Sequence, residues 1–406
     1  MKGKEREYRT LCFFNEGLDR GVKEETMEPW DLTIGRWEKE GLKSEFTKKM
    51  KIPPVPTELG FLPRNREIEP WEHYYMTILA DEVFELEKTI GYDPVVRMAF
   101  RIPFLSCEEK IIEENEIFLI KRDVDGWYRK YDKDRKVNTS LEAIPVRPAV
   151  WDEKSWEFHK NHTLEAYARY CTDDNLKKMY GKYQSLSEEG EYPIRFRLMG
   201  FFWILRDLMD NEPMLYAWYD YPEMIQDIHR FQLEIYKEQM DKILKIVKPG
   251  VLFFEEDLSG KTGPMISPET FDKFLRPCYE EIIPFLKERG VGHVFVDTDG
   301  DFTKLIPNFM ASGVDGFLPV DVNAGVDIVK VRESFPTLKF IGGFNKLEIV
   351  KGPEAIDREF ERLKPVIQQG GYLCGIDHQA APDTPWEYYQ YYVMRLGQVM
   401  EQYRRG

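Results

Sequence analysis

Short apolar runs alternate with longer amphipathic stretches from about residue 193 to the end of the chain. Each apolar run ends in a polar turn, and the stretch that follows carries apolar residues at helical spacing. This alternation predicts parallel strands joined by helices, the arrangement of a (β/α) barrel. The predicted strands are 193–199, 251–256, 293–297, 315–320, 338–342 and 371–376.

The first half of the chain follows a less regular pattern. Residues 8–14 predict a first strand, and apolar residues at three- and four-residue spacing predict a helix over 71–90 that Gly91 closes. Asp125-Gly126 lies between two strand-like runs and predicts a hairpin, so residues 93–150 are read as an antiparallel excursion from the barrel. No long linker divides the chain, and a single domain over 1–406 is expected.

Two helix starts in the second half carry clear capping residues. Ser267 precedes Pro268, which predicts a hydroxyl N-cap followed by proline at the first helical position. Thr384-Pro385-Trp386-Glu387 predicts a capping box at the start of the last helix.

Polar side chains gather where the predicted strands end. Glu256 and Asp257 end one run, Asp297 and Asp299 end the next, and His378 ends the last. Because active sites of such barrels lie at the carboxyl ends of the strands, these five residues are the catalytic candidates. Four of them also have a structural alternative. Asp257 caps a helix, one of Asp297 and Asp299 caps the helix that begins near Asp301 while the other binds loop amides, and His378 is an ordinary loop residue.

The spacing of these candidates adds detail to that prediction. Asp297 and Asp299 stand two apart, so on a strand both side chains share one face. Asp377 precedes His378, and a neighbouring carboxylate could fix the tautomer of an imidazole.

Composition narrows the classes of protein. The net charge of −15 argues against non-specific nucleic-acid binding, which requires Lys and Arg to neutralise phosphates. The five cysteines form no C-x-x-C pair, as expected of free thiols in a reducing compartment. No apolar run is long enough for a membrane span and no signal peptide is evident, so a cytoplasmic protein without a membrane partner is expected.

Residues 256–268, 296–300 and 370–385 resemble the uroporphyrinogen decarboxylase superfamily, which also contains cobalamin-dependent methyltransferases. The resemblance implies a (β/α)8 TIM barrel of the α/β class. The decarboxylases carry an Arg-Gln-Ala-Gly-Arg signature near the N-terminus, whereas the corresponding residues 13–20 here contain a single arginine, Arg20. A porphyrinogen with many carboxylates would require a cationic site, so uroporphyrinogen is not the expected substrate.

The methyltransferase branch of the superfamily has a His-x-Cys pair and a later Cys that bind zinc. Asp297 and Asp299 match the first pair, and His378 matches the last cysteine. The resemblance therefore implies a divalent metal on these three residues, zinc as the first expectation, with manganese or iron as alternatives for harder ligands. In the decarboxylase branch a histidine at the position of His378 contacts substrate.

The resemblance leads to one expected function and two alternatives. The expected function is a methyltransferase for a small molecule or a corrinoid, with Glu256 near the metal and a partner protein carrying the corrinoid. The first alternative is a cofactor-independent decarboxylase or lyase of a small acid, in which Asp297 or Asp299 stabilises a developing cation. The second is a non-catalytic ligand-binding barrel. Decarboxylase relatives also suggest a homodimer.

Overall fold

A computed structural model describes residues 1–13, 17–50, 70–73, 75–76, 80–104, 107–133 and 143–402. Its centre is a sheet of eight strands in the order β1-β2-β7-β8-β11-β12-β13-β14, and from β2 onward all neighbours are parallel. The strands are β1 Tyr75–Met76, β2 Val96–Phe100, β7 Ile194–Met199, β8 Val251–Glu255, β11 His293–Thr298, β12 Gly316–Pro319, β13 Lys339–Phe344 and β14 Tyr372–Ile376. The six strands predicted in the second half are confirmed, with ends shifted by up to two residues.

Residues 22–26 lie between β14 and β2, where the ring of parallel strands would otherwise be open. The backbone N–H of Asp93 donates to the carbonyl of Lys23 at 2.6 Å. The N–H of Ile376 donates to Oε1 of Glu25 at 2.8 Å, from the other side. An extended segment therefore stands in the position that a further strand has in a (β/α)8 barrel.

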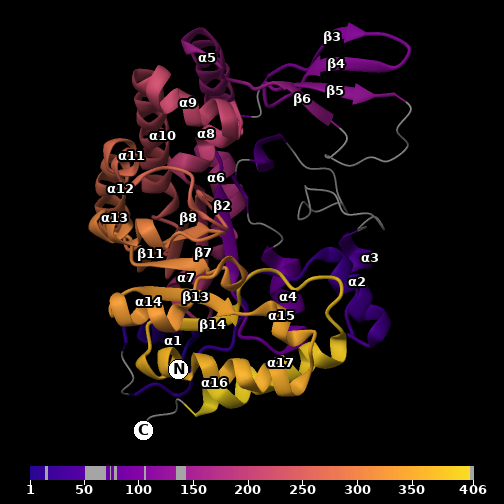
Figure 1. Ribbon diagram of the computed structural model, residues 1–406, viewed down its shortest axis with the longest axis vertical. Helices are drawn as coiled ribbons and strands as arrows, with labels where there is room; N and C mark the ends of the chain where they lie inside the picture. The colour runs from indigo at the N-terminus through magenta and orange to yellow at the C-terminus, as the bar shows by residue number, and fades with distance from the viewer. Residues whose placement is uncertain are drawn as a thin grey trace.

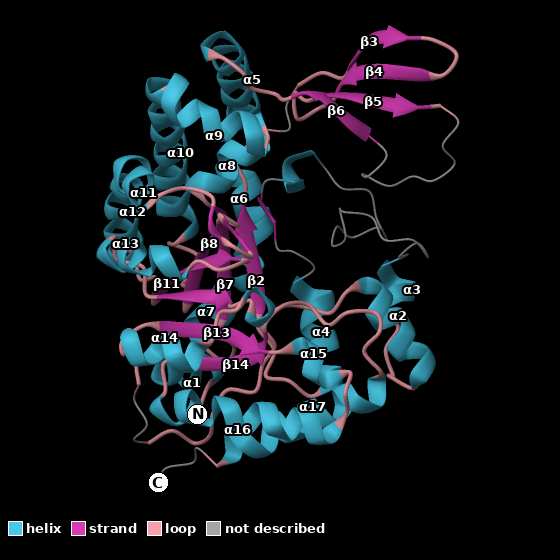
Figure 2. Cartoon of the chain, viewed as in Figure 1, coloured by secondary structure: helices cyan, strands magenta, loops and turns pink. Residues whose placement is uncertain are grey.

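Helices cover the outside of the sheet, as Figure 2 shows. They are α1 Gly3–Leu11, α2 Asp31–Glu40, α3 Phe46–Met50, α4 Ala80–Ile90, α5 Glu153–Tyr170, α6 Asp173–Tyr180, α7 Gln184–Glu189, α8 Phe201–Met209, α9 Asn211–Asp220, α10 Pro222–Ile243, α11 Pro268–Phe274, α12 Arg276–Glu288, α13 Ile306–Ala311, α14 Ile328–Ser334, α15 Lys346–Ile349, α16 Pro353–Gln369 and α17 Trp386–Glu401. None of the helices in the described ranges is both long and apolar enough to cross a membrane.

The buried apolar residues form two layers because side chains alternate across each strand. Inside the ring lies a small cluster made of Leu11, Val22, Val251, Phe295, Leu318, Ile341 and Leu373. The larger layer lies between the strands and the helices and includes Phe254, Val294 and Val296. This alternation decides which residues at the strand ends face the interior: on β8 it is Glu255 and on β11 it is Asp297.

The predicted hairpin at Asp125-Gly126 is confirmed and belongs to a separate antiparallel sheet. That sheet has the order β3-β4-β5-β6, with β3 Lys110–Glu114, β4 Phe118–Arg122, β5 Tyr128–Asp132 and β6 Ala143–Arg147. It projects from the barrel beside α5 (Figure 1). The excursion is shorter than predicted, because β2 is part of the barrel. A second two-stranded hairpin, β9 Ser259–Gly260 and β10 Gly263–Pro264, follows β8.

Two predicted elements near the N-terminus are wrong. Residues 8–14 were expected as a strand, but α1 extends to Leu11, and it buries Leu11 and Glu7. The helix expected over 71–90 begins only at Ala80, where Asp81 and Glu82 occupy its first turn. Residues 70–73 form a 3₁₀ turn and β1 pairs with β2, so strand pairing replaces the first helical turns; residues 74 and 77–79 lie outside the described chain.

One of the two predicted helix caps is confirmed. Ser267 caps α11 by accepting from the N–H of Thr270 at 3.1 Å. Thr384 does not cap α17, whose N-cap is Pro385. The N–H of Trp386 donates instead to Oε2 of Glu40 at 2.7 Å, so α2 supplies the acceptor that a capping box would have supplied.

Candidate functional site

Charged side chains from several strands meet at the carboxyl end of the barrel, which we call the mouth. Arg197 of β7 and Glu255 of β8 form an ion pair, with Nη1 and Oε2 3.0 Å apart, and each side chain is about four-fifths buried. Asp297 of β11 lies next to Glu255 in the sheet register. The Asp297 residue is only 8% exposed, and its carboxyl forms no hydrogen bond or ion pair with a described residue.

The surroundings of Asp297 favour its neutral form. Burial, followed by the negative charges of Glu255, Asp257 and Asp299, raises the pKa of Asp297 well above its usual range, and Arg197 opposes the rise. Like charges and burial both penalise an ionised carboxylate. The raised pKa favours the protonated form of Asp297, and its carboxyl lies at a position that faces the mouth and has no hydrogen-bond partner among the described residues, which suits a general acid.

The structure brings Asp299 and His378 together, although they stand 79 positions apart in the chain. Nε2 of His378 lies 3.7 Å from Oδ2 of Asp299, too far for a hydrogen bond. Trp30 stacks on the imidazole, with ring centroids 6.5 Å apart and planes at 25°. Burial, followed by the charge of Lys346, lowers the pKa of His378, so the imidazole is neutral at neutral pH.

Asp257 supports the loop that carries Asp299. Its Oδ1 accepts from the N–H of Asp299 at 3.1 Å, and its carbonyl accepts from Nη1 of Arg206 at 2.8 Å. Its φ of 39° is in the left-handed region, which aspartate tolerates better than most residues. Burial and then the charge of Asp299 raise the pKa of Asp257 to about 6. These contacts fit the structural alternative, and the catalytic role of Asp257 stays a prediction.

Glu256 faces away from the mouth, contrary to the expectation that it lies near the other candidates. Its carboxylate accepts from the N–H groups of Phe201, Phe202 and Trp203 at 2.8–3.0 Å and from the hydroxyl of Tyr279. These groups are the start of α8 and a residue of α12, both outside the sheet. Because neighbouring strand residues point to opposite faces, Glu255 occupies the interior position. Glu256 thus binds the N-terminus of α8, a role that was not predicted for it from the sequence.

Asp377 also serves a purpose different from the one expected. Its Oδ1 accepts from the N–H of Lys346 at 3.0 Å, and Oδ2 accepts from Nδ2 of Asn323 at 3.1 Å and the N–H of Val322 at 3.3 Å. The carboxylate therefore ties the loops after β12 and β13 to β14. It does not hold the imidazole of His378, whose Nδ1 is buried without a hydrogen-bond partner.

The three predicted metal ligands do not fit a metal ion as they stand. Across the described residues no group of three or more His, Cys, Asp and Glu side chains has its donor atoms placed to hold one. Asp297 favours a proton, whereas a ligand must be ionised. Metal binding by Asp297, Asp299 and His378 stays a prediction, and the chemistry proposed below uses the side chains alone.

Three residues of the mouth were absent from the sequence-based candidates: Arg197, Glu255 and Arg101. Arg197 had a signal, because it and Arg195 alternate within an otherwise apolar strand, which is unusual for a buried one. Glu255 and Glu256 are the same residue type and differ only in whether the side chain points into or out of the barrel. That direction depends on where β8 lies in the sheet. Arg101 follows β2, a strand that was not predicted.

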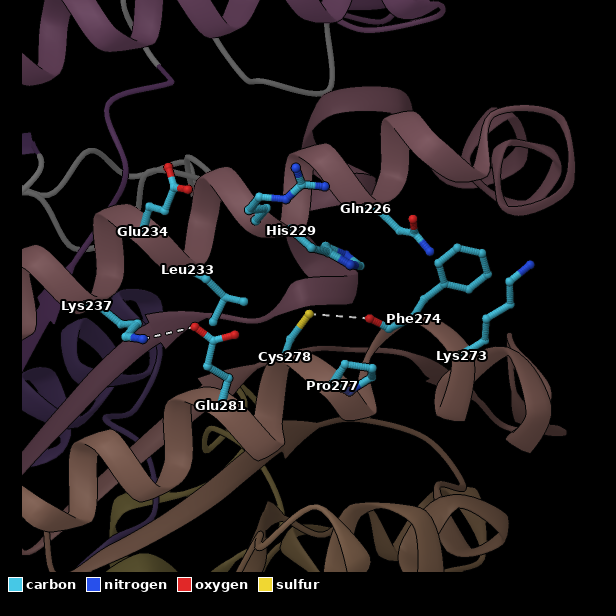
Figure 3. A pocket seen from close by; sticks show the side chains of 11 residues that line it. Gln226, His229, Leu233, Glu234, Lys237, Lys273, Phe274, Pro277, Cys278 and Glu281 are labelled. Atoms are coloured by element: carbon cyan, nitrogen blue, oxygen red, sulfur yellow. Dashed lines mark hydrogen bonds and ion pairs between the residues drawn. The ribbon is translucent and has the colours of Figure 1, made fainter.

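A second hollow lies outside the barrel between α10 and the α11–α12 pair (Figure 3). Its volume is about 560 Å³, and its walls include His229, Lys237, Cys278 and Glu281. Lys237 pairs with Glu281 at 3.0 Å, and the thiol of Cys278 donates to the carbonyl of Phe274 at 3.4 Å. None of the predicted site residues reaches it, so the mouth remains the candidate active site.

One solved structure supports this fold. A protein of Methanosarcina mazei described as a methyltransferase is similar in structure, with a TM-score of 0.58 and 13% identity over 98% of this chain and 99% of that one. A Listeria monocytogenes protein described as a candidate vitamin-B12-independent methionine synthase has a TM-score of 0.39 and 12% identity, over 92% and 95% of the two chains. No curated protein matches the sequence.

The sequence comparison with protein families identifies a relationship directly. The family model described as uroporphyrinogen decarboxylase (URO-D) matches residues 163–396, which is more than half of the chain. The matched region contains β7 to β14 and therefore all but one of the strands that form the mouth. The chain belongs to the uroporphyrinogen decarboxylase family.

Proposed function

We propose that this protein is a methyltransferase that acts on a small molecule, with Asp297 as its general acid. The observation that carries the proposal is the buried carboxyl of Asp297 at an interior-facing position near the end of its strand, which has no hydrogen-bond partner among the described residues and whose raised pKa favours the protonated form. A methyl group leaves a heteroatom more readily when a positioned acid protonates that atom. The similar fold of the Methanosarcina mazei methyltransferase is compatible with this reaction but does not by itself decide it.

In the proposed step, the bond between the methyl carbon and its heteroatom breaks. The electron pair of that bond stays on the heteroatom, which takes the proton of Asp297. The methyl group passes to the electron pair of an acceptor nucleophile. Arg197 stabilises the Asp297 carboxylate that results, and the ion pair with Glu255 holds Arg197 in position. Solvent returns the proton afterwards.

The acceptor in this proposal is a reduced corrinoid that a partner protein presents at the mouth. The test combines the purified protein with free cob(I)alamin and a panel of methylated amines, thiols and ethers, and follows methylcobalamin by absorbance. We expect methylcobalamin to form with at least one donor, and only when the protein is present. Methyl transfer to a simple thiol without corrinoid would support the methyltransferase activity and contradict the need for a corrinoid partner.

A carboxy-lyase is the second candidate, because a neutral Asp297 can also protonate the carbanion left by decarboxylation. Family membership favours it. Release of carbon dioxide from a small acid with no methyl acceptor present would establish this alternative. Ligand binding without either reaction would establish the non-catalytic barrel.

The predicted metal is checked separately. We expect metal analysis of the purified protein to decide whether zinc, manganese or iron binds stoichiometrically, and His378→Ala to remove any metal held at this site. Activity that is lost on chelation and restored by one divalent ion would add a metal-assisted step. Equal activity before and after chelation would contradict the metal prediction and leave Asp297 as the acid.

A further inference from the structure

The charges of the mouth indicate what kind of substrate it takes. Resting on the proposed function, we propose that the substrate is a zwitterion whose carboxylate binds Arg101 and whose ammonium group lies against Trp30 and Asp299. Three features support the proposal. Arg101 after β2 and Arg197 on β7 form a cationic arc, and Asp257, Asp299 and Asp321, after β8, β11 and β12, form an anionic arc. Asp297 lies between the arcs and has no partner among the described residues.

The cationic arc holds a guanidinium that lacks a counter-ion bond. Arg101 follows β2, and β2 pairs with β7, which carries Arg197. Nε of Arg101 is buried without a hydrogen-bond partner. Burial and the like charge of Arg197 lower the pKa of Arg101, since Glu255 and Asp207 compensate only in part. A half-buried arginine whose Nε is enclosed and whose charge is incompletely neutralised is a site for a carboxylate, which it can bind through two parallel hydrogen bonds.

The anionic arc lies further along the ring of strands. The side chain of Asp299 is 43% exposed, and its Oδ2 lies 3.7 Å from Nε2 of His378. Burial and then the negative charge of Asp321 raise the pKa of Asp299, and the positive charge of Lys346 opposes the rise. The carboxylates of Asp257, Asp299 and Asp321 outnumber this one cation, so an added cation would relieve their repulsion. Trp30 is 40% exposed and stacks over the neutral His378. An exposed indole beside a carboxylate suits an alkylated ammonium group, which binds the ring face.

Asp297 connects the two arcs. Asp297 is on β11, which follows β2, β7 and β8 around the sheet, and it pairs with Glu255 of β8. Asp299 follows it by two residues in the sequence. It is more than nine-tenths buried and has no partner among the described residues, although its position faces the mouth. A ligand that spans the arcs would bring the atoms between its two charges past this acid, so the methyl donor is a heteroatom with a free electron pair that lies between those charges.

Ligands of one charge sign do not satisfy the site. An anion without a cationic group would bind Arg101 but meet the carboxylates of Asp257 and Asp299. A cation without an anionic group would leave the guanidinium of Arg101 buried and unpaired, which costs free energy. Only a ligand with both charges, separated along its length, matches both arcs.

Calorimetric titration of the full chain tests the inference with matched probes. The zwitterions are glycine betaine, β-alanine betaine and γ-butyrobetaine, which differ in the distance between charges. Choline carries the cation alone, and tert-butylacetate is the shape of glycine betaine without the positive charge. We expect the best betaine to bind at least about tenfold more tightly than choline or tert-butylacetate.

Single variants assign the two ends. Arg101→Gln should weaken the best betaine about tenfold or more and leave choline unchanged, whereas Arg101→Lys should lose less because it keeps the charge. Trp30→Ala should weaken the betaine and choline alike, by about three- to thirtyfold, and leave tert-butylacetate unchanged. Thermal unfolding of each variant confirms that it is folded.

Several outcomes overturn the inference. The first is that no betaine binds, and the second is that choline binds as tightly as the best betaine. The third is that Arg101→Gln weakens choline and the best betaine equally. Failure of the proposed function is distinguishable, because a betaine can bind without reacting. Binding of a betaine without any methyl transfer or decarboxylation would contradict the function alone. Methyl transfer from an uncharged donor, with a KM unchanged in Arg101→Gln, would contradict the inference alone.

Discussion

Replacing Asp297 with asparagine should lower kcat by about a hundred- to ten-thousandfold while leaving substrate binding nearly unchanged. Asparagine has the shape of a neutral aspartic acid and the same absence of charge, but it cannot give up a proton at neutral pH. The substitution therefore removes only the proton transfer. The measurement is steady-state kinetics with the donor identified by methyl transfer, together with a titration of that donor into both proteins.

The pH dependence provides the independent readout for Asp297. A general acid works only while protonated, so activity should fall as the pH rises through the raised pKa of Asp297. Asp297→Asn should lose this alkaline limb. Asp299→Asn is the matched control, because removing a negative charge that raises this pKa should move the limb to lower pH without abolishing it. A pH profile that is identical in wild type and Asp297→Asn would rule out the acid role.

Replacing Glu256 with alanine should destabilise the protein by about 3–5 kcal/mol, because several buried donors would lose their acceptor at once. The donors are the first N–H groups of α8 and the hydroxyl of Tyr279. The variant also loses a negative charge at a helix N-terminus and leaves a small cavity. Equilibrium unfolding in urea measures the effect, provided that the midpoint changes and the slope does not.

Ser267→Ala is the matched control for Glu256, since Ser267 caps α11 through one exposed hydrogen bond. Its loss should cost about 1 kcal/mol. If Glu256→Ala were no more destabilising than Ser267→Ala, the supporting role of Glu256 would be wrong. Glu256→Gln addresses the catalytic prediction, because a folded variant with full kcat removes Glu256 from the chemistry.

The pH dependence of stability has a definite sign at Glu256. Burial raises its pKa from the ordinary 4.5 to about 7 despite the donors around it, so the folded state holds the proton more tightly than the unfolded state. The contribution of this residue to the free energy of unfolding is then fully present below about pH 4.5 and declines as the pH rises to about 7. The difference in stability between wild type and Glu256→Gln should show this decline, whereas Glu7 and Glu25 titrate in both proteins and cancel.

The alternation of apolar runs and amphipathic stretches was sufficient to predict the strands of the second half, because strand and helix periods are local properties of the chain. It also placed Asp297, Asp299 and His378 at strand ends that share one edge of the sheet. Near the N-terminus local pattern failed. Residues 8–14 are apolar enough for a strand, but residues 8–11 belong to α1, and β1 pairs with β2, so tertiary contacts override the local preference there.

Tertiary structure alone decided which polar residues face the mouth. Glu255 and Glu256 are adjacent and chemically alike, yet the register of β8 against β7 and β11 sends one to the interior and the other to the start of α8. Asp377 beside His378 binds distant loops because the backbone turns at the end of β14. Arg101 meets Arg197 through pairing of β2 with β7, nearly a hundred residues apart, and no local period encodes that distance. The pKa of Asp297 depends on burial and on the charges of Glu255, Asp257, Asp299 and Arg197, so the chemistry of the site is a property of the fold.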